Sequence, residues 1–290
     1  MQVPPVWQFR DRRLVLDRPA VVGILNVTPD SFSDGGHFLA PDAAVGQGAR
    51  MLADGADMLD IGGQSTRPQG ATPVSATEEL GRILPVVKRL RDAFPEALLS
   101  VDTVQGEVAE VVLDAGVDAI NDVSGLRLDP TMAAICAAAR CGVILMHSRG
   151  GVAEMGTFEH ALYGADPVSA VHAELRASVE LAERGGVNRS CMVVDPGIGF
   201  AKRTEHSLAV LGRLPSLVAW GYPVMVGVSR KRFIGDITGV TTAVERVDGT
   251  TGANVAALAL GASLFRVHDV RAARQALDVA WAIFQSGRAA

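Results

Sequence analysis

Short apolar runs recur along the chain at the spacing typical of β/α units, and each ends at a residue that can hydrogen-bond or carry charge. The eight runs cover residues 21–25, 58–59, 98–101, 119–120, 143–146, 192–194, 223–228 and 262–265, and they end at Asn26, Asp60, Asp102, Asn121, His147, Asp195, Ser229 and Arg266. The strands of a (β/α)8 barrel all end at one mouth, where the active sites of such barrels lie. The pattern therefore predicts an α/β fold, a TIM barrel whose terminal polar residues share one cavity.

Between these runs, apolar residues recur with the period of a helix. The predicted helices cover residues 41–54, 77–93, 105–115, 130–140, 166–184, 204–213, 248–260 and 270–285. Ahead of the first run, apolar segments at 7–9 and 14–16 flank a polar stretch and predict a small β-hairpin. We interpret the chain as one domain over residues 1–290, with a hairpin region at 1–19 that closes the bottom of the barrel.

Composition narrows the function classes. The length of 290 residues suits one barrel, and a hydrophobic content of 48% supplies an ample core. The net charge of −5 includes no polybasic run, which argues against sequence-independent nucleic-acid binding. No uncharged apolar stretch approaches the roughly 18 residues of a membrane span, and the first residues lack a signal-peptide core. We expect a cytoplasmic protein with small substrates, no nucleic-acid or membrane partner, and reduced, buried Cys136, Cys141 and Cys191.

Two connections after predicted strands carry candidate chemistry. Residues 27–36 combine carboxylates, hydroxyls, an aromatic ring and glycines, which suits a lid over a substrate. Residues 62–68 offer glycine backbone N–H groups, hydroxyls and a guanidinium, which suit an anion. A third connection, 148–165, is long, and a solvated surface loop explains it as well as a functional one.

The ordered motifs resemble the dihydropteroate synthase family, the pterin-binding enzymes of folate synthesis and targets of sulfonamides. The motifs are GILNVTPDSFSDGG (23–36), GGQSTRP (62–68), SVDT (100–103), IND (120–122), LMH (145–147), DPGIGF (195–200), SRK (229–231) and RVHD (266–269). They span almost the whole chain, and chance agreement of so many ordered motifs at strand ends is negligible. One position departs from the family pattern, because Gln64 replaces the usual glutamate of the second loop.

The resemblance implies that 6-hydroxymethyl-7,8-dihydropterin pyrophosphate condenses with 4-aminobenzoate to give 7,8-dihydropteroate and pyrophosphate. A pterin ring presents adjacent N–H donors and one carbonyl acceptor, so its pocket needs buried carboxylates, an amide and a cationic donor. By resemblance, Asp195 accepts from the 2-amino group and N3, and Asn121 satisfies the neighbouring ring nitrogen and amino group. Asp102 holds the other side of the ring, and Lys231 donates to the carbonyl oxygen.

The pyrophosphate needs cations, because a leaving oxyanion is best held by guanidinium groups and a divalent ion. The residues expected to bind it are Asn26, Thr66, Arg67, Arg266 and His268. By resemblance, Asn26 and Asp34 bind Mg²⁺. The catalytic residues expected from the resemblance are Asp34, Asp102, Lys231, Arg266 and His268.

The aminobenzoate is expected near Phe32, Thr66, Pro68, Phe200 and Ser229. Ser229 lacks the Gly-x-Ser-x-Gly elbow of a serine nucleophile, so covalent catalysis is disfavoured. The leaving group is expected to ionise without a covalent enzyme intermediate. A homodimer is a further hypothesis, based on the expected exposure of Leu258, Trp281 and Phe284 on the last two helices.

Several of these residues also fit structural roles. Asp102 and Asp195 could pair inside the barrel, and Asn121 or Asp122 could cap the next helix. Lys231 could belong to a basic surface, and Arg67 and Arg266 could form surface ion pairs. For Asp60 and His147 we expect a structural role. Other functions remain open as well: a pterin-binding methyltransferase, a metal-dependent barrel hydrolase, a Schiff-base aldolase acting through Lys231, and a non-catalytic pterin-binding relative. The methyltransferase has no use for Arg67, Arg266 and His268, and the hydrolase lacks a His-x-His motif after the first strand.

Overall fold

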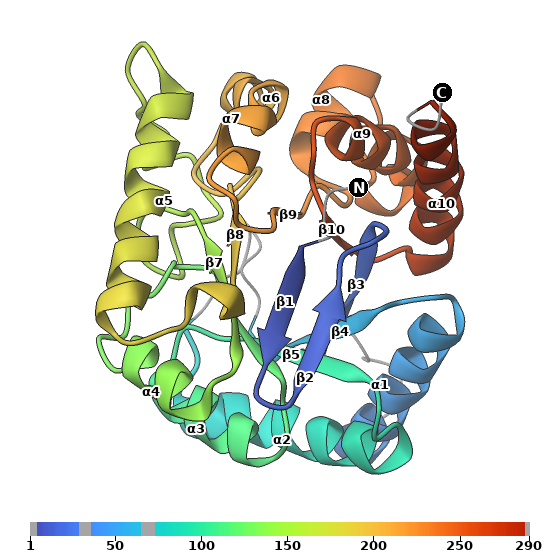
Figure 1. Ribbon diagram of the computed structural model, residues 1–290. Helices are drawn as coiled ribbons and strands as arrows, with labels where there is room; N and C mark the ends of the chain where they lie inside the picture. The colour runs from blue at the N-terminus through green and yellow to red at the C-terminus, as the bar shows by residue number, and fades with distance from the viewer. Residues whose placement is uncertain (1–4, 29–35, 65–72, 288–290) are drawn as a thin grey trace.

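The computed structural model describes residues 5–28, 36–64 and 73–287. Within them, eight parallel strands lie in the order β8-β7-β6-β5-β4-β3-β10-β9. A bridge between Val194 and Val224 brings the two outer strands together, so the sheet forms a nearly closed barrel. Helices alternate with the strands and surround them (Figure 1). The predicted (β/α)8 barrel with an N-terminal hairpin is confirmed.

The bounds of the elements are as follows. The hairpin is β1 (Val6–Phe9) and β2 (Arg12–Val15), and the barrel strands are β3 (Ala20–Asn26), β4 (Met58–Gly62), β5 (Leu98–Asp102), β6 (Ala119–Asp122), β7 (Gly142–Met146), β8 (Met192–Asp195), β9 (Met225–Val226) and β10 (Leu264–Val267). The α-helices are α1 (Gly36–Ala53), α2 (Ala76–Ala93), α3 (Gly106–Asp114), α4 (Met132–Ala139), α5 (Pro167–Arg184), α6 (Thr204–Gly212), α7 (Leu214–Val218), α8 (Arg232–Thr238), α9 (Val247–Ala259) and α10 (Val270–Ser286). Two short 3-10 helices are η2 (Arg189–Cys191) and η3 (Ala243–Glu245).

Alternate residues of the barrel strands belong to two different cores. Val21 and Leu59 pack in the core that the strands share with the helices. Val22 and Met58, one position away in each strand, pack in a second core together with the hairpin. Because both faces of the strands are buried, the apolar runs are nearly continuous rather than alternating with polar residues.

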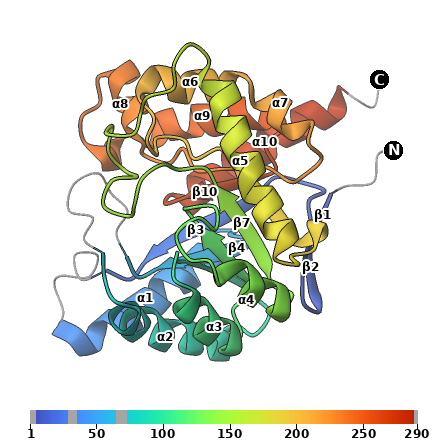
Figure 2. The same ribbon diagram turned by 90° about the vertical axis from the view of Figure 1, so that its left-hand side faces the viewer.

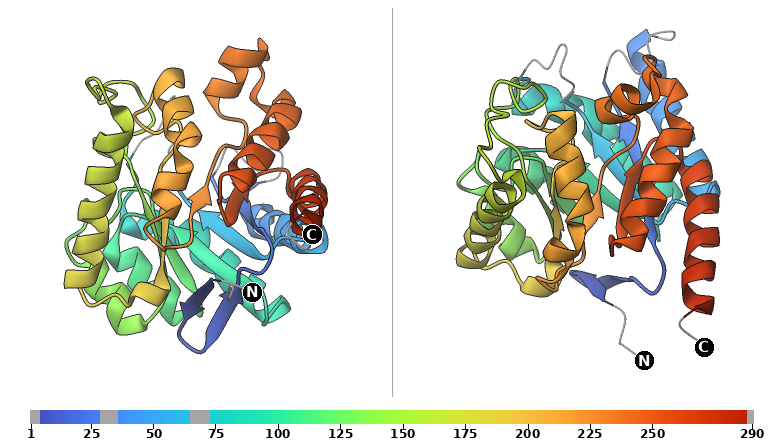
Figure 3. Two further views of the ribbon diagram at one scale, coloured as in Figure 1. Left: turned by 45° about the horizontal axis from the view of Figure 1, so that its top comes forward. Right: turned by 90° about the horizontal axis from the view of Figure 1, so that it is seen from above.

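The hairpin closes the end of the barrel opposite the polar strand ends. Trp7 and Phe9 are fully buried in the second core, and the indole Nε1–H of Trp7 donates to the carbonyl oxygen of Cys191 at 2.7 Å. A side chain at Gly142 would meet Phe9 at 2.6 Å, so glycine lets the hairpin approach β7 closely. Figures 2 and 3 show β1 and β2 at one end of the barrel, and Figure 2 shows the segment between β7 and α5 at the other.

Replacing Trp7 by alanine is expected to lower the free energy of unfolding by about 3–5 kcal/mol, because it leaves a cavity beneath the barrel and an unpaired carbonyl at Cys191. Chemical denaturation measures the change. The matched control is Arg13→Ala on the exposed face of β2, for which we expect a change within roughly 0.5 kcal/mol. Equal effects of the two substitutions would contradict a structural role for the hairpin.

Some element bounds differ from the sequence predictions. Helix α1 begins at Gly36 rather than at 41. The prediction started at Pro41 because proline is a typical first residue of a helix, but in the structure Pro41 lies inside α1. The run 223–228 forms a strand only at Met225–Val226, with a bridge at Val224. Helices α7 and α8 were not predicted, since five and seven residues are too few to show a helical period.

Two further expectations concern the surface and the thiols. Cys136, Cys141 and Cys191 are free and buried, as predicted. The expected exposure is wrong for Leu258, which is 6% exposed, and holds only in part for Trp281 and Phe284, whose rings are partly buried against the core between the strands and the helices. The large apolar residues of α10 that are exposed are Val279 and Ile283. In the described part of the chain, no helix is long and apolar enough to cross a membrane.

Candidate active site

The polar strand ends continue the inward-facing rows of the barrel. Asn26, Gly62, Asp102 and Asn121 are neighbours in register across β3, β4, β5 and β6. Each lies an even number of residues after a strand residue that packs in the second core. Because side chains alternate between the two faces of a strand, these positions also point to the inside of the barrel, at its mouth. Gly62 leaves the space between Asn26 and Asp102 open, because a Cβ there would lie 3.7 Å from Asn26 Oδ1 and 3.8 Å from Asp102 Cβ.

Arg266 crosses the mouth from β10 and pairs with two carboxylates. Its Nε donates to Asp60 Oδ2 at 2.6 Å, and its Nη2 donates to Asp102 Oδ2 at 2.9 Å. No described residue accepts a hydrogen bond from its Nη1, which leaves the two N–H groups of that nitrogen available for a ligand. Arg266 is therefore an internal cation and not part of a surface ion pair.

Asp60 is a structural acceptor, as the sequence suggested. Its carboxylate is fully buried and accepts from Ser100 Oγ at 2.6 Å and Asn121 Nδ2 at 3.0 Å, in addition to Arg266. The amide of Asn121 is thereby held in one orientation and does not cap a helix. Its Oδ1 is buried and has no hydrogen-bond partner among the described residues.

Three buried aspartates at the strand ends have raised pKa values. Burial raises the pKa of Asp195 to about 6, although the Gly197 N–H bond and the positive charges of Lys231 and Arg266 oppose the change. Burial also raises the pKa of Asp102 above its ordinary value, against the effect of Arg266. Asp122 has a pKa of about 6 for the same reason, but its Oδ1 accepts from the N–H and hydroxyl groups of Ser124 in a turn beside the strand end.

Lys231 lies against an aromatic ring. Its Nζ is 3.9 Å from the centroid of the Phe200 ring, and burial together with Arg266 lowers its pKa to about 8. The interpretation of Lys231 as part of a solvated basic surface is therefore wrong. Gly227 separates Asp195 from Arg266, since a Cβ there would lie 3.9 Å from Asp195 Oδ2 and 4.0 Å from Arg266 Cβ.

Ser229 and His268 meet at the last two strand ends. The Ser229 hydroxyl accepts from the backbone N–H of His268 at 3.2 Å and lies 3.0 Å from His268 Nδ1. The next residues reinforce this contact, because Arg230 forms a bidentate ion pair with Asp269. Loops after the last two strands of such barrels commonly bind phosphate.

Some predicted site residues cannot be placed. Phe32, Asp34, Thr66, Arg67 and Pro68 lie outside the described residues. Of the two predicted Mg²⁺ ligands, only Asn26 is described, and its amide oxygen lies beside Gly62, 3.7 Å from where a Cβ of that residue would be. An amide oxygen is a suitable ligand for a hard cation that keeps most of its waters.

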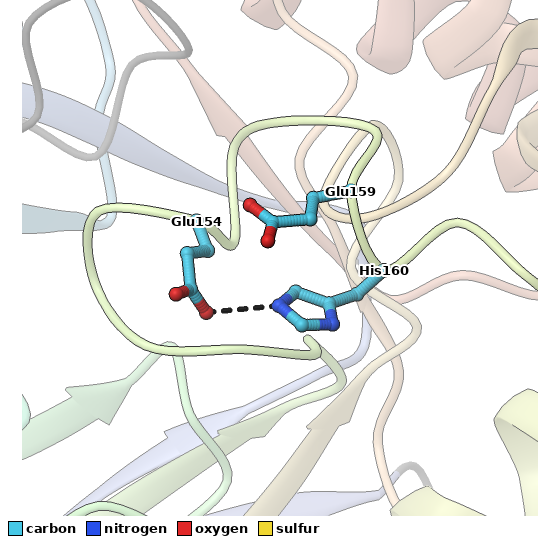
Figure 4. A group of neighbouring side chains, drawn as sticks. All are labelled: Glu154, Glu159 and His160. Atoms are coloured by element: carbon cyan, nitrogen blue, oxygen red, sulfur yellow. Dashed lines mark hydrogen bonds and ion pairs between the residues drawn. The ribbon is translucent and has the colours of Figure 1, made fainter.

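A different group of side chains lies close enough to hold one metal ion. Glu154, Glu159 and His160, in the connection between β7 and α5, have ligand atoms within 4.8 Å of one another (Figure 4). Glu154 Oε2 and His160 Nε2 already form an ion pair at 2.8 Å when the histidine is protonated. This group was not predicted from the sequence, and it contains none of the expected Mg²⁺ ligands.

Sequence reasoning also missed Lys202, which is buried and hydrogen-bonded to His147. The available signal was that the chain has only three lysines, and this one lies two residues after the DPGIGF motif. His147 itself has the structural role that was expected. Burial lowers its pKa to about 3, so the ring is neutral, and its Nε2–H donates to Glu174 at 3.1 Å.

Comparison with known proteins adds to this geometry. The family described as "Pterin binding enzyme" matches residues 22–268. The dihydropteroate synthase of Mycobacterium leprae (strain TN) is 47% identical over 272 residues, which cover 92% of this chain and 94% of that protein.

Two solved structures of the dihydropteroate synthase of Xanthomonas albilineans are also similar. The structure with 4-aminobenzoic acid has a TM-score of 0.89 at 44% identity and covers 97% of this chain and 98% of that one. The complex with 7,8-dihydropteroate has a TM-score of 0.85 at 42% identity and covers 97% of this chain and 99% of that one.

Proposed function

The chain belongs to the dihydropteroate synthase family of pterin-binding enzymes, transferases of folate synthesis, and we propose that it condenses 6-hydroxymethyl-7,8-dihydropterin pyrophosphate with 4-aminobenzoate. In this reaction the bond between the pterin methylene carbon and the pyrophosphate oxygen breaks. A bond forms between that carbon and the amine nitrogen of 4-aminobenzoate, which loses a proton. The products are 7,8-dihydropteroate and pyrophosphate.

The buried Oδ1 of Asn121, which has no partner in the part of the chain that the structure describes, is the observation that carries this proposal. An amide oxygen without a partner in a dry site costs about 1–3 kcal/mol, so the site is prepared for a donor from a ligand. The amide cannot simply turn, since its Nδ2 is held by Asp60. A pterin ring offers N–H groups to this oxygen and to the carboxylate of Asp195, and its carbonyl oxygen would accept from Lys231.

The cations beside the ring would bind the pyrophosphate. None of the described residues accepts a hydrogen bond from Nη1 of Arg266, and His268, two positions further along the chain, is held by its contacts with Ser229. Asn26 together with Asp34 would hold Mg²⁺, which supplies positive charge to the departing pyrophosphate. Thr66 and Arg67 of the second loop complete the proposed pyrophosphate site.

The reaction needs no protein nucleophile. An electron-rich dihydropterin stabilises positive charge on its methylene carbon once pyrophosphate leaves, so the protein mainly holds charges and orients the reactants. The carboxylates of Asp102 and Asp195 at the barrel mouth would stabilise such a cation. The aminobenzoate would lie near Phe200 and Ser229, with Phe32, Thr66 and Pro68 contributed by the loops.

Release of pyrophosphate tests the proposal. We expect release by the purified protein only when the dihydropterin pyrophosphate and 4-aminobenzoate are both present, with one dihydropteroate formed per pyrophosphate. Release without 4-aminobenzoate, or none with both substrates, would contradict the proposal. Borohydride provides the control for the aldolase alternative: a trapped adduct at Lys231 would mean that this amine acts as a nucleophile.

The finer predictions on assembly and location rest on the sequence alone. A cytoplasmic location and a homodimer are both proposed on that basis. If a dimer forms through α10, its apolar contacts are Val279 and Ile283, each 62% exposed, rather than the three residues first expected.

A further inference from the structure

Lys202 is a buried lysine whose ammonium group is fully matched with acceptors. It is 2% exposed, and its Nζ lies 2.7 Å from His147 Nδ1, 3.0 Å from the carbonyl oxygen of Gly197 and 3.1 Å from that of Phe200. A protonated lysine has exactly three N–H donors, so each donor has one acceptor. A neutral amine would leave one of the three acceptors without a donor.

The histidine that accepts from Lys202 is held in place by a hydrogen bond to Glu174, which in turn binds Arg149. Because His147 is neutral and donates its Nε2–H to Glu174, its Nδ1 is an acceptor and faces Lys202. Glu174 in turn accepts from Arg149 Nε at 2.9 Å, and these contacts lower its pKa to about 2. Asp195 and Glu174 are the carboxylates that favour the charged form of Lys202, against burial, which lowers its pKa to about 7.

The two carbonyl groups that Lys202 binds belong to the turn that follows Asp195. Gly197 has a positive φ of 65°, and its N–H donates to Asp195 Oδ1 at 2.7 Å. A Cβ at Gly197 would lie 1.8 Å from the carbonyl oxygen of His147, so only glycine fits. Phe200 lies at the other end of the turn, and the Nζ of Lys231 lies over its ring. Lys202 therefore holds both ends of a turn that bears two walls of the proposed ring pocket.

The long connection between β7 and α5 covers this arrangement. The backbone N–H of Ala201 donates to the carbonyl oxygen of Met155 at 2.7 Å, and Met155 is fully buried in a small core with Phe200. The two ends of this connection are also joined, because the guanidinium of Arg149 lies 3.9 Å from the centroid of the Tyr163 ring and donates to the carbonyl oxygen of Leu162. The segment 148–165 thus packs against Phe200 and brings the ring of Tyr163 near Lys202, whose Nζ lies 6.0 Å from the ring centroid.

We infer that Lys202 is a positioning residue for the pterin pocket, which fixes the carboxylate of Asp195 and the ring of Phe200 through the turn between them. This inference rests on the proposed function, because the affected ligand is the pterin ring. Lys202 does not touch the reacting atoms in this assignment. It acts through the backbone of the turn, and its ammonium group is buried near Tyr163 of the 148–165 segment.

Lys202→Met tests the inference, with Lys88→Met on the exposed face of α2 as the matched control. Calorimetry with 6-hydroxymethylpterin, which lacks the pyrophosphate, measures ring binding in each protein. We expect the Kd of Lys202→Met to rise at least roughly tenfold, which corresponds to about 1.4 kcal/mol, and that of Lys88→Met to stay unchanged. Amide hydrogen exchange at residues 197–201 is expected to accelerate only in Lys202→Met.

A purely structural role has a different signature. It would lower the fraction of folded protein, and hence the binding stoichiometry, with an unchanged Kd, and this result would overturn the inference. If Lys202→Met fails to fold, amide hydrogen exchange in the unaltered protein provides the test. Slow exchange at residues 197–201 without ligand supports the inference. Exchange that becomes slow only when the pterin binds overturns it. Failure of the unaltered protein to bind the pterin would refute the proposed function, whereas the exchange comparison would still test the anchoring of the turn.

Discussion

Replacing Asp195 by asparagine is expected to weaken binding of the pterin ring roughly hundredfold and, at the same time, to make the free protein more stable. Asparagine keeps the oxygen that accepts from the Gly197 N–H, but it turns the second oxygen into a donor that faces the donors of the ring. Losing charged hydrogen bonds and leaving ligand donors unpaired accounts for a loss of this size. Calorimetric titration with 6-hydroxymethylpterin measures it.

The gain in stability follows from the raised pKa. Asp195 is 2% exposed, and its pKa is about 6 in the folded protein against an ordinary value of 3.8. At pH 7 the carboxyl is ionised in both states, so the folded state carries a penalty on the order of 3 kcal/mol at most. The penalty is present above the folded pKa and disappears as the pH falls below 3.8. The stability advantage of Asp195→Asn is therefore expected to shrink from pH 7.5 to pH 4 in denaturant unfolding.

Asp122→Asn is the matched control for both effects. Asp122 is fully buried with a pKa near 6, and asparagine keeps the oxygen that accepts from Ser124. We expect this variant to gain stability at pH 7 and to bind the pterin unchanged. Similar losses of pterin binding in both variants would show that buried charge in general, and not Asp195 in particular, determines binding.

Much of the site could be predicted because parallel strands end together. Asn26, Asp102 and Asn121 are far apart in sequence, but each ends an apolar run, and the register of β3 to β6 brings them into one row. The period of two along each strand decides that they face inward. Local sequence therefore contained the information on where these residues point. The single domain over residues 1–290 stays a prediction.

The rest depended on contacts that no local pattern contains. Arg266 is separated by 206 residues from Asp60 and by 164 from Asp102, so its pairing with both carboxylates appears only in the folded chain. Lys202 is similar, because its acceptor His147 lies 55 residues away. Leu258 was misplaced for another reason: the buried face of α9 includes the polar residues Thr250 and Asn254, so the spacing of apolar residues does not show which face is buried.

Replacing Arg266 by alanine is expected to lower the free energy of unfolding by about 3–5 kcal/mol, because it leaves Asp60 and Asp102 buried without a countercharge. Denaturant unfolding measures this loss. The same variant is expected to lose more affinity for the dihydropterin pyrophosphate than for 6-hydroxymethylpterin, since only the former would reach the Nη1 group.

Arg266→Lys separates the two roles. Lysine keeps a positive charge between the carboxylates, so a smaller loss of stability is expected than with alanine. It lacks the planar fork whose Nε and Nη2 bind the carboxylates while Nη1 remains for a phosphate oxygen. The preference for the pyrophosphate-bearing ligand over the free pterin is therefore expected to fall in both variants. Equal losses for the two ligands would mean that Arg266 serves only to orient Asp102, and the proposed division between ring-binding carboxylates and pyrophosphate-binding cations would be wrong.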